Sequence, residues 1–134
     1  MNVDALSAYF ARRGDVRLAI LFGSRARGNA RADSDVDVAV QFDDEAARRT
    51  GLAHPQFAIA ADLARVCGHP VDVVDLRTAP PPLAFVIAGE GRVLFERSSG
   101  LSLDFRAGAY DRYADTAPLR RVREQYLMED IRRT

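Results

Sequence analysis

Two apolar segments separated by a polar loop place the strongest constraint on the fold of this chain. The first, VRLAILF at residues 16–22, is apolar apart from Arg17, as in a strand that is buried on both faces. The second, VDVAVQF at residues 36–42, alternates and is rich in valine, which also predicts a strand. The segment GSRARGNARADS between them predicts a loop with room for one helical turn. The loop therefore joins the end of one strand to the start of the other.

The rest of the chain alternates predicted helices and strands. Apolar residues at helical spacing predict a first helix over about residues 3–13, stopped by Gly14. Residues 43–51 predict a polar connection. A helix is predicted over residues 52–66, ending at Gly68, with its apolar positions at Phe57, Ala60, Ala61 and Ala64.

Two further strands and two further helical stretches complete the chain. The strands are expected at residues 70–76 and 91–96, and the prolines at 80–82 open the helix between them. From about Leu103 the chain is expected to be helical, kinked or divided at Pro118, with apolar contacts at Phe105, Tyr113, Val122, Tyr126 and Leu127. This order predicts one α/β (α+β) domain, a mixed sheet of about four strands flanked by helices. A length of 134 residues suits a single core.

Composition narrows the classes of function. The nineteen basic and nineteen acidic residues give a net charge of zero, so direct nucleic-acid binding through bulk charge is not expected. Every basic residue is an arginine, so no lysine is available to bind a phosphate or to form a Schiff base. Cys67 is the only cysteine, which excludes an intrachain disulfide and a cysteine-based metal site. With no apolar run near 20 residues and no signal-like N-terminus, we expect a cytoplasmic protein without membrane contact.

The start of the second strand carries a pair of carboxylates. Strand alternation places Asp35 and Asp37 on one face, while Val36, Val38 and Val40 face the core. Two close like charges repel each other, and a divalent cation relieves that repulsion. Oxygen ligands favour Mg²⁺ or Mn²⁺.

A third carboxylate and a phosphate-binding turn complete the candidate site. Asp72 and Asp75 have opposite parity on the third strand, so only one of them can face the pair. The turn after the first strand offers backbone N–H groups, the Ser24 hydroxyl and, at Gly23, no side chain, which suits a phosphate. The combination favours phosphoryl or nucleotidyl transfer.

Residues 23–40 resemble the signature of the DNA polymerase beta-like nucleotidyltransferases, in which Gly-Ser is followed after ten residues by Asp-x-Asp. The short length and the later segments resemble the minimal nucleotidyltransferases, the antitoxins of HEPN–MNT toxin–antitoxin pairs. The matching later segments are PVDVVDL, PPLAFVIAGEGRVLFERS and DFRAGAYDRYADTAPLRRVREQYL. The resemblance implies one nucleotidyltransferase domain over residues 1–134, with residues 101–134 as a C-terminal helical segment.

The resemblance also implies a role for each residue of the motif. Gly23 and Ser24 would hold the triphosphate of the incoming nucleotide, and Asp35, Asp37 and Asp72 would be the catalytic metal ligands. Asp72 would also help to activate the attacking hydroxyl. Antitoxins of this family transfer AMP from ATP to a tyrosine of the partner HEPN toxin, an RNase. The implied cofactor is Mg²⁺, with ATP as donor and an HEPN toxin as partner.

Several residues near the motif have two interpretations. Arg25 and Arg27 flank the turn, where guanidinium groups suit phosphates and solvent exposure is the alternative; we include Arg25 among the nucleotide-binding residues. The spacing of Arg49 and His54 fits the Arg-x4-His pattern of HEPN ribonucleases, and we interpret it as coincidence. We expect a loop-capping role for Asp33.

Two alternative functions also fit the sequence. Tyrosines and arginines in the C-terminal stretch suit a partner surface, in a hetero-complex or a homo-oligomer, so the chain could neutralise a toxin by complex formation alone. Nucleotidyl transfer to a small molecule is the other alternative, although such relatives usually carry an extra acceptor-binding domain.

Overall fold

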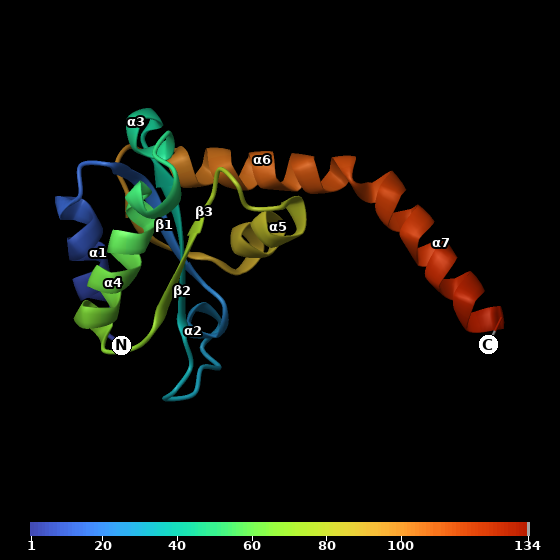
Figure 1. Ribbon diagram of the computed structural model, residues 1–134, viewed down its shortest axis with the longest axis horizontal. Coiled ribbons are helices and arrows are strands. Elements are labelled where there is room, and N and C mark those ends of the chain that lie inside the picture. Colours follow the sequence, from blue (N-terminus) through green and yellow to red (C-terminus); the bar gives the residue numbers. More distant parts are fainter. Residues whose placement is uncertain (134) are drawn as a thin grey trace.

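A four-stranded mixed sheet forms the centre of the molecule (Figure 1). The computed structural model describes the backbone of residues 1–133 and the side chains up to Gln125, together with Met128. The strand order is β3-β2-β1-β4. β1 pairs antiparallel with both β2 and β4, whereas β2 and β3 are parallel. The bounds are Val16–Phe22 for β1, Val36–Phe42 for β2, Val71–Asp75 for β3 and Arg92–Glu96 for β4.

One face of the sheet is covered by α1 (Val3–Arg12) and α4 (Pro55–Cys67) (Figure 1). Leu6 and Phe10 lie one turn apart on α1 and are fully buried against the valine face of β2. Burying side chains of this size contributes about 1.5–3 kcal/mol each. The predicted first helix and the inward-facing valines are therefore confirmed.

The other face is covered by α5 (Pro81–Glu90) and α6 (Leu101–Asp115). Leu18, Ile20 and Phe22 of β1 pack there against Ile87, while the alternate residues of β1 pack under α1 and α4. Burial on both faces explains why β1 is apolar at every position except the partly buried Arg17.

The connection between β2 and β3 differs in detail from the prediction. Residues 43–51 contain the short helix α3 (Asp44–Ala47), which the Asp43 side chain caps. A 3₁₀ turn, η1 (Gly51–Ala53), precedes α4, so Leu52 lies outside the helix and is 89% exposed.

The buried side of α4 is also rotated relative to the prediction. Ile59 and Leu63 face the core, whereas Phe57 is 48% exposed. The predicted positions Ala60, Ala61 and Ala64 lie beside the buried stripe or outside it. Larger aliphatic side chains gain more free energy from burial than alanine does, so they set the orientation of the helix.

Two helices form an arm at the C-terminus. α6 is followed by α7 (Ala117–Arg133), and Figure 1 shows α7 extending away from the sheet. The predicted division near Pro118 falls at Thr116. Tyr113 stacks on Phe85 of α5 as an apolar contact, but Val122 is 47% exposed, so that predicted contact is wrong.

Phe105 packs against the core as predicted. Tyr126 and Leu127, the other two predicted contacts, lie outside the described side chains. Within the described part of the chain, every helix is too short or too polar to cross a membrane.

Candidate active site

The turn after β1 brings the two halves of the sequence motif into contact. Gly23 has a φ of 75° and precedes α2 (Ser24–Arg27), the single helical turn predicted in this loop. A Cβ at Gly23 would overlap the Asp37 carboxylate. Glycine is therefore favoured twice, by the positive φ and by the close approach of Asp37. The turn and the first carboxylate pair thus form one site.

Sheet register brings a third carboxylate to this site. In the parallel pairing of β2 with β3, Asp72 is the direct partner of Asp37. Burial raises the pKa of the Asp37 carboxyl above its usual range, and the negative charges of Asp72 and Asp35 raise it further. The three carboxylates predicted from the sequence are therefore close enough to interact electrostatically.

Asp75, the alternative third carboxylate, faces the opposite side of the sheet. It is 7% exposed, and it accepts hydrogen bonds from the Arg77 N–H at 2.9 Å and from His54 Nε2 at 3.0 Å. Nδ1 of His54 accepts the Gln56 N–H at 3.1 Å and so caps α4. The proton therefore resides on Nε2. This structural role for His54 agrees with our interpretation of the Arg-x4-His spacing as coincidence.

The donor set suits a hard divalent cation. Among the described residues, no group of three or more His, Cys, Asp or Glu side chains converges on one point. The chemistry of the set nevertheless fits, since burial and the charges of Asp72 and Asp35 raise the Asp37 pKa, and a bound cation would offset this mutual repulsion. Oxygen ligands alone favour Mg²⁺ or Mn²⁺ over softer metals.

The two arginines of the turn have protein partners. Arg25 Nη2 donates to the Ser34 carbonyl at 2.8 Å, which braces the loop before β2. Arg27 pairs with Glu90 of α5 at 3.1 Å. The predicted cap at Asp33 is provided instead by its neighbour Ser34, whose hydroxyl accepts the Arg31 N–H at 2.8 Å.

Glu90 is a residue of this site that sequence reasoning missed. Its Oε1 accepts the N–H of Gly23 at 3.1 Å. The available signal was weak: a single acidic residue ends the otherwise apolar helix α5 and is followed by Gly91.

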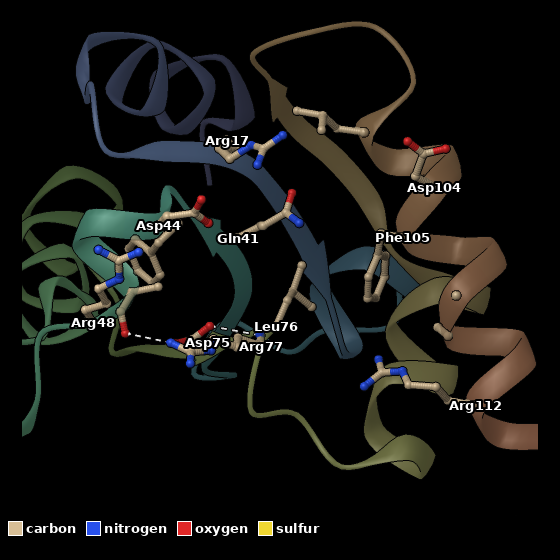
Figure 2. Close-up of a pocket in the computed structure, with 15 residues that line it drawn as sticks. Arg17, Gln41, Asp44, Arg48, Asp75, Leu76, Arg77, Asp104, Phe105 and Arg112 are labelled. Carbon is tan, nitrogen blue, oxygen red and sulfur yellow. Dashed lines mark hydrogen bonds between the residues drawn. The ribbon is translucent and has the colours of Figure 1, made fainter. Parts of the chain in front are cut away.

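A cavity of about 690 Å³ lies at the opposite end of the sheet (Figure 2). Arginines and carboxylates of β1, β3 and α6 surround it, among them Arg17, Asp75, Asp104 and Arg112. It contains none of the carboxylates near Gly23. This cavity and the motif residues therefore belong to different ends of the sheet.

Comparisons with known proteins agree with this geometry. The family model described as "Polymerase beta, Nucleotidyltransferase" matches residues 4–100. The chain is 33% identical over 86 residues to the protein adenylyltransferase MntA of Aphanizomenon flos-aquae (strain 2012/KM1/D3), an alignment that covers 60% of this chain and 57% of that protein. The chain thus matches little more than half the length of this relative.

Two solved structures share the fold. A toxin–antitoxin crystal structure with AMP-PNP superposes with a TM-score of 0.80 at 23% identity, covering 96% of this chain and 99% of the other. A complex of tri-AMPylated Shewanella oneidensis HEPN toxin with MNT antitoxin gives a TM-score of 0.71 at 22% identity, covering 94% and 97%. From its fold, its motif and its match to the family over residues 4–100, this chain belongs to the polymerase beta nucleotidyltransferase family.

Proposed function

We propose that this chain is a cytoplasmic antitoxin that transfers AMP from ATP to a tyrosine of a partner HEPN ribonuclease toxin. Family membership supports the nucleotidyl transfer. Likeness to a protein adenylyltransferase supports a protein as the acceptor. Likeness to the antitoxin bound to an AMPylated HEPN toxin supports the partner. In this proposal residues 1–134 act as one minimal nucleotidyltransferase domain, with residues 101–134 as its helical segment.

The register of β2 with β3 is the observation that carries the proposal. It sets Asp72 directly beside Asp37, while the turn at Gly23 touches Asp37 from the other side. A turn that can bind phosphate, beside carboxylates close enough to interact electrostatically, supplies the two elements that nucleotidyl transfer requires.

In the proposed reaction, the turn after β1 binds the nucleotide and Asp72 acts on the attacking hydroxyl. Gly23, Ser24 and Arg25 form the nucleotide-binding turn, in which Arg25 acts by holding the loop at Ser34. The tyrosine oxygen forms a bond to the α-phosphorus of ATP, the bond from that phosphorus to the bridging oxygen breaks, and pyrophosphate leaves. Asp72 receives or guides the proton of the attacking hydroxyl.

Mg²⁺ is the proposed cofactor. Asp35, Asp37 and Asp72 would hold it, and when bound it would neutralise phosphate charge and lower the pKa of the acceptor hydroxyl. The added positive charge would oppose the effects of burial and of the neighbouring carboxylates, which raise the pKa of Asp37.

The test is intact-mass analysis of a mixture of the purified chain, Mg²⁺, ATP and its HEPN partner. We expect one or more AMP groups on the partner with the parental chain and none with Asp37→Asn. Asp33→Asn is the matched control, because Asp33 lies in the loop just before β2 and outside the carboxylate set. Transfer by Asp37→Asn at the parental rate would contradict the metal assignment.

Neutralisation by complex formation alone is the second candidate. The extended arm favours it, because α7 exposes Leu119 by 74% and Val122 by 47%. If this candidate is correct, Val122→Glu abolishes toxin protection whereas Asp37→Asn retains it. The reverse result supports the transferase, and transfer to a small molecule instead of the partner would contradict both.

A further inference from the structure

Glu90 ties together both ends of the turn that follows β1. Its Oε1 accepts the Gly23 N–H at 3.1 Å, and its two carboxylate oxygens accept from Arg27 Nη1 at 3.1 and 3.2 Å. Gly23 precedes α2 and Arg27 is its last residue. One carboxylate from a distant helix therefore spans the whole turn.

Glu90 does not stabilise its own helix electrostatically. Glu90 is the last residue of α5, where the helix dipole presents its negative end and disfavours a carboxylate. It also adds to the negative charge around Asp37, whose pKa it helps to raise. The bonds to Gly23 and Arg27 offset these electrostatic costs. Glu90 therefore stabilises the turn after β1 and not its own helix α5.

The next residue fixes Glu90 against the sheet. A Cβ at Gly91 would collide with the Ile20 side chain and with the Ile87 carbonyl, so the backbone packs directly on β1. The Gly91 N–H donates to the Ile87 carbonyl at 2.8 Å. Because β1 also leads into the turn, the end of α5 that carries Glu90 packs on the same strand that precedes Gly23.

We propose that Glu90 is a positioning residue for the donor nucleotide. It holds Gly23 and Arg27 in the arrangement in which the turn receives the phosphates of ATP, and it acts through these two residues. The inference rests on the proposed function, and it identifies a residue outside the Gly-Ser and Asp-x-Asp motif that controls donor affinity.

The test measures donor affinity and turnover separately in the full-length chain. We expect Glu90→Ala to raise the Kd for Mg²⁺–AMP-PNP, measured by titration calorimetry, and the KM for ATP by about tenfold. The kcat at saturating ATP should stay close to the parental value. Glu90→Gln keeps an acceptor oxygen for the Gly23 N–H and loses the ion pair, so it should recover part of the affinity.

Glu96→Ala is the matched control. Glu96 lies at the far end of β4, and its Oε1 accepts a backbone N–H, that of Ser102, at 2.9 Å. It therefore makes the same type of bond away from the turn. We expect its Kd for AMP-PNP to equal that of the parental chain.

Two results would overturn the inference. One is a parental Kd and KM in Glu90→Ala; the other is a lower kcat and melting temperature with an unchanged KM, which indicates a purely structural role. A parental chain that binds AMP-PNP but transfers no AMP contradicts the proposed function alone, and the Kd comparison still decides the role of Glu90. A parental chain that binds no nucleotide overturns both.

Discussion

Aspartate side chains at the two ends of the sheet have opposite environments. Asp72 and Asp75 lie three residues apart on β3, yet Asp72 joins other carboxylates near Gly23 while Asp75 is buried with hydrogen-bond donors from His54 and Arg77. A carboxylate whose acceptor atoms are satisfied by the protein stabilises the fold. One that the fold sets among like charges adds repulsion, which agrees with its proposed role in binding a cation. The following predictions test this contrast, from the largest expected effect to the smallest.

The largest effect is expected for Asp72→Asn. Removing a charge that stabilises the transition state should lower the initial rate of AMP transfer by about 10³-fold. The melting temperature should stay the same or rise, because repulsion of Asp37 is relieved. A variant that unfolds at lower temperature and keeps the parental rate would reverse the contrast between the two aspartates.

Gly23→Ala should separate crowding at the site from backbone strain. Its Cβ would displace the Asp37 carboxylate, and a misplacement of this kind lowers the rate by about 10²-fold. Gly28→Ala is the control, because Gly28 has a similar φ of 79° and open space around the added Cβ. Gly28→Ala should lose about 1–2 kcal/mol of unfolding free energy. Gly23→Ala should lose at least as much, because its φ of 75° and ψ of −158° form a combination that only glycine adopts readily. Equal rates in the two would show that the contact between Gly23 and Asp37 is unimportant.

Asp75→Ala should affect stability alone. It leaves His54 Nε2 and the Arg77 N–H without their acceptor, at a cost of about 2–3 kcal/mol in the free energy of unfolding. Urea denaturation measures this loss, and Asp75→Asn, which keeps one acceptor oxygen, should lose less. The transfer rate per folded molecule should remain parental; a specific loss of rate would assign Asp75 to the active site.

The smallest effect concerns acid stability at the Asp75 end of the sheet. Hydrogen bonds from Arg13 at 2.7 and 2.9 Å lower the pKa of the Asp15 carboxyl. A depressed folded pKa adds stability above the unfolded value of about 3.9, and this stability is lost as the pH falls through the folded pKa. Asp15→Asn should therefore reduce the melting temperature slightly at pH 7 and flatten its decline below pH 4. Parallel melting curves for both chains across that range would refute the assignment.

The sequence predicts most of the fold and the core of the candidate site for identifiable reasons. β1 and β2 have hydrophobic patterns that match their burial, and the motif residues at 23–24 and 35–37 lie beside each other because these strands are neighbours. Parity alone left Asp72 and Asp75 as alternatives, because the choice depends on the register with β2.

Features that depend on long-range packing were harder to predict from the sequence. Glu90 reaches Gly23 across 67 positions of the chain, and no local pattern encodes that pairing. The rotation of α4 was mispredicted because its alanines suit either side of the helix, and the choice falls to Ile59 and Leu63. Val122 was expected to make an apolar contact, whereas it is exposed and α7 extends away from the sheet.

The parallel register of β2 and β3 makes the site depend on complete folding of the chain. Asp37 and Asp72 come together only when α4 and both strands are in place, and a slip of one residue would turn every side chain of β3 to the opposite face. A chain in which β3 is unpaired or out of register would therefore lack the Asp37–Asp72 pair altogether. Any activity that depends on this pair should rise and fall with the folded fraction of the chain.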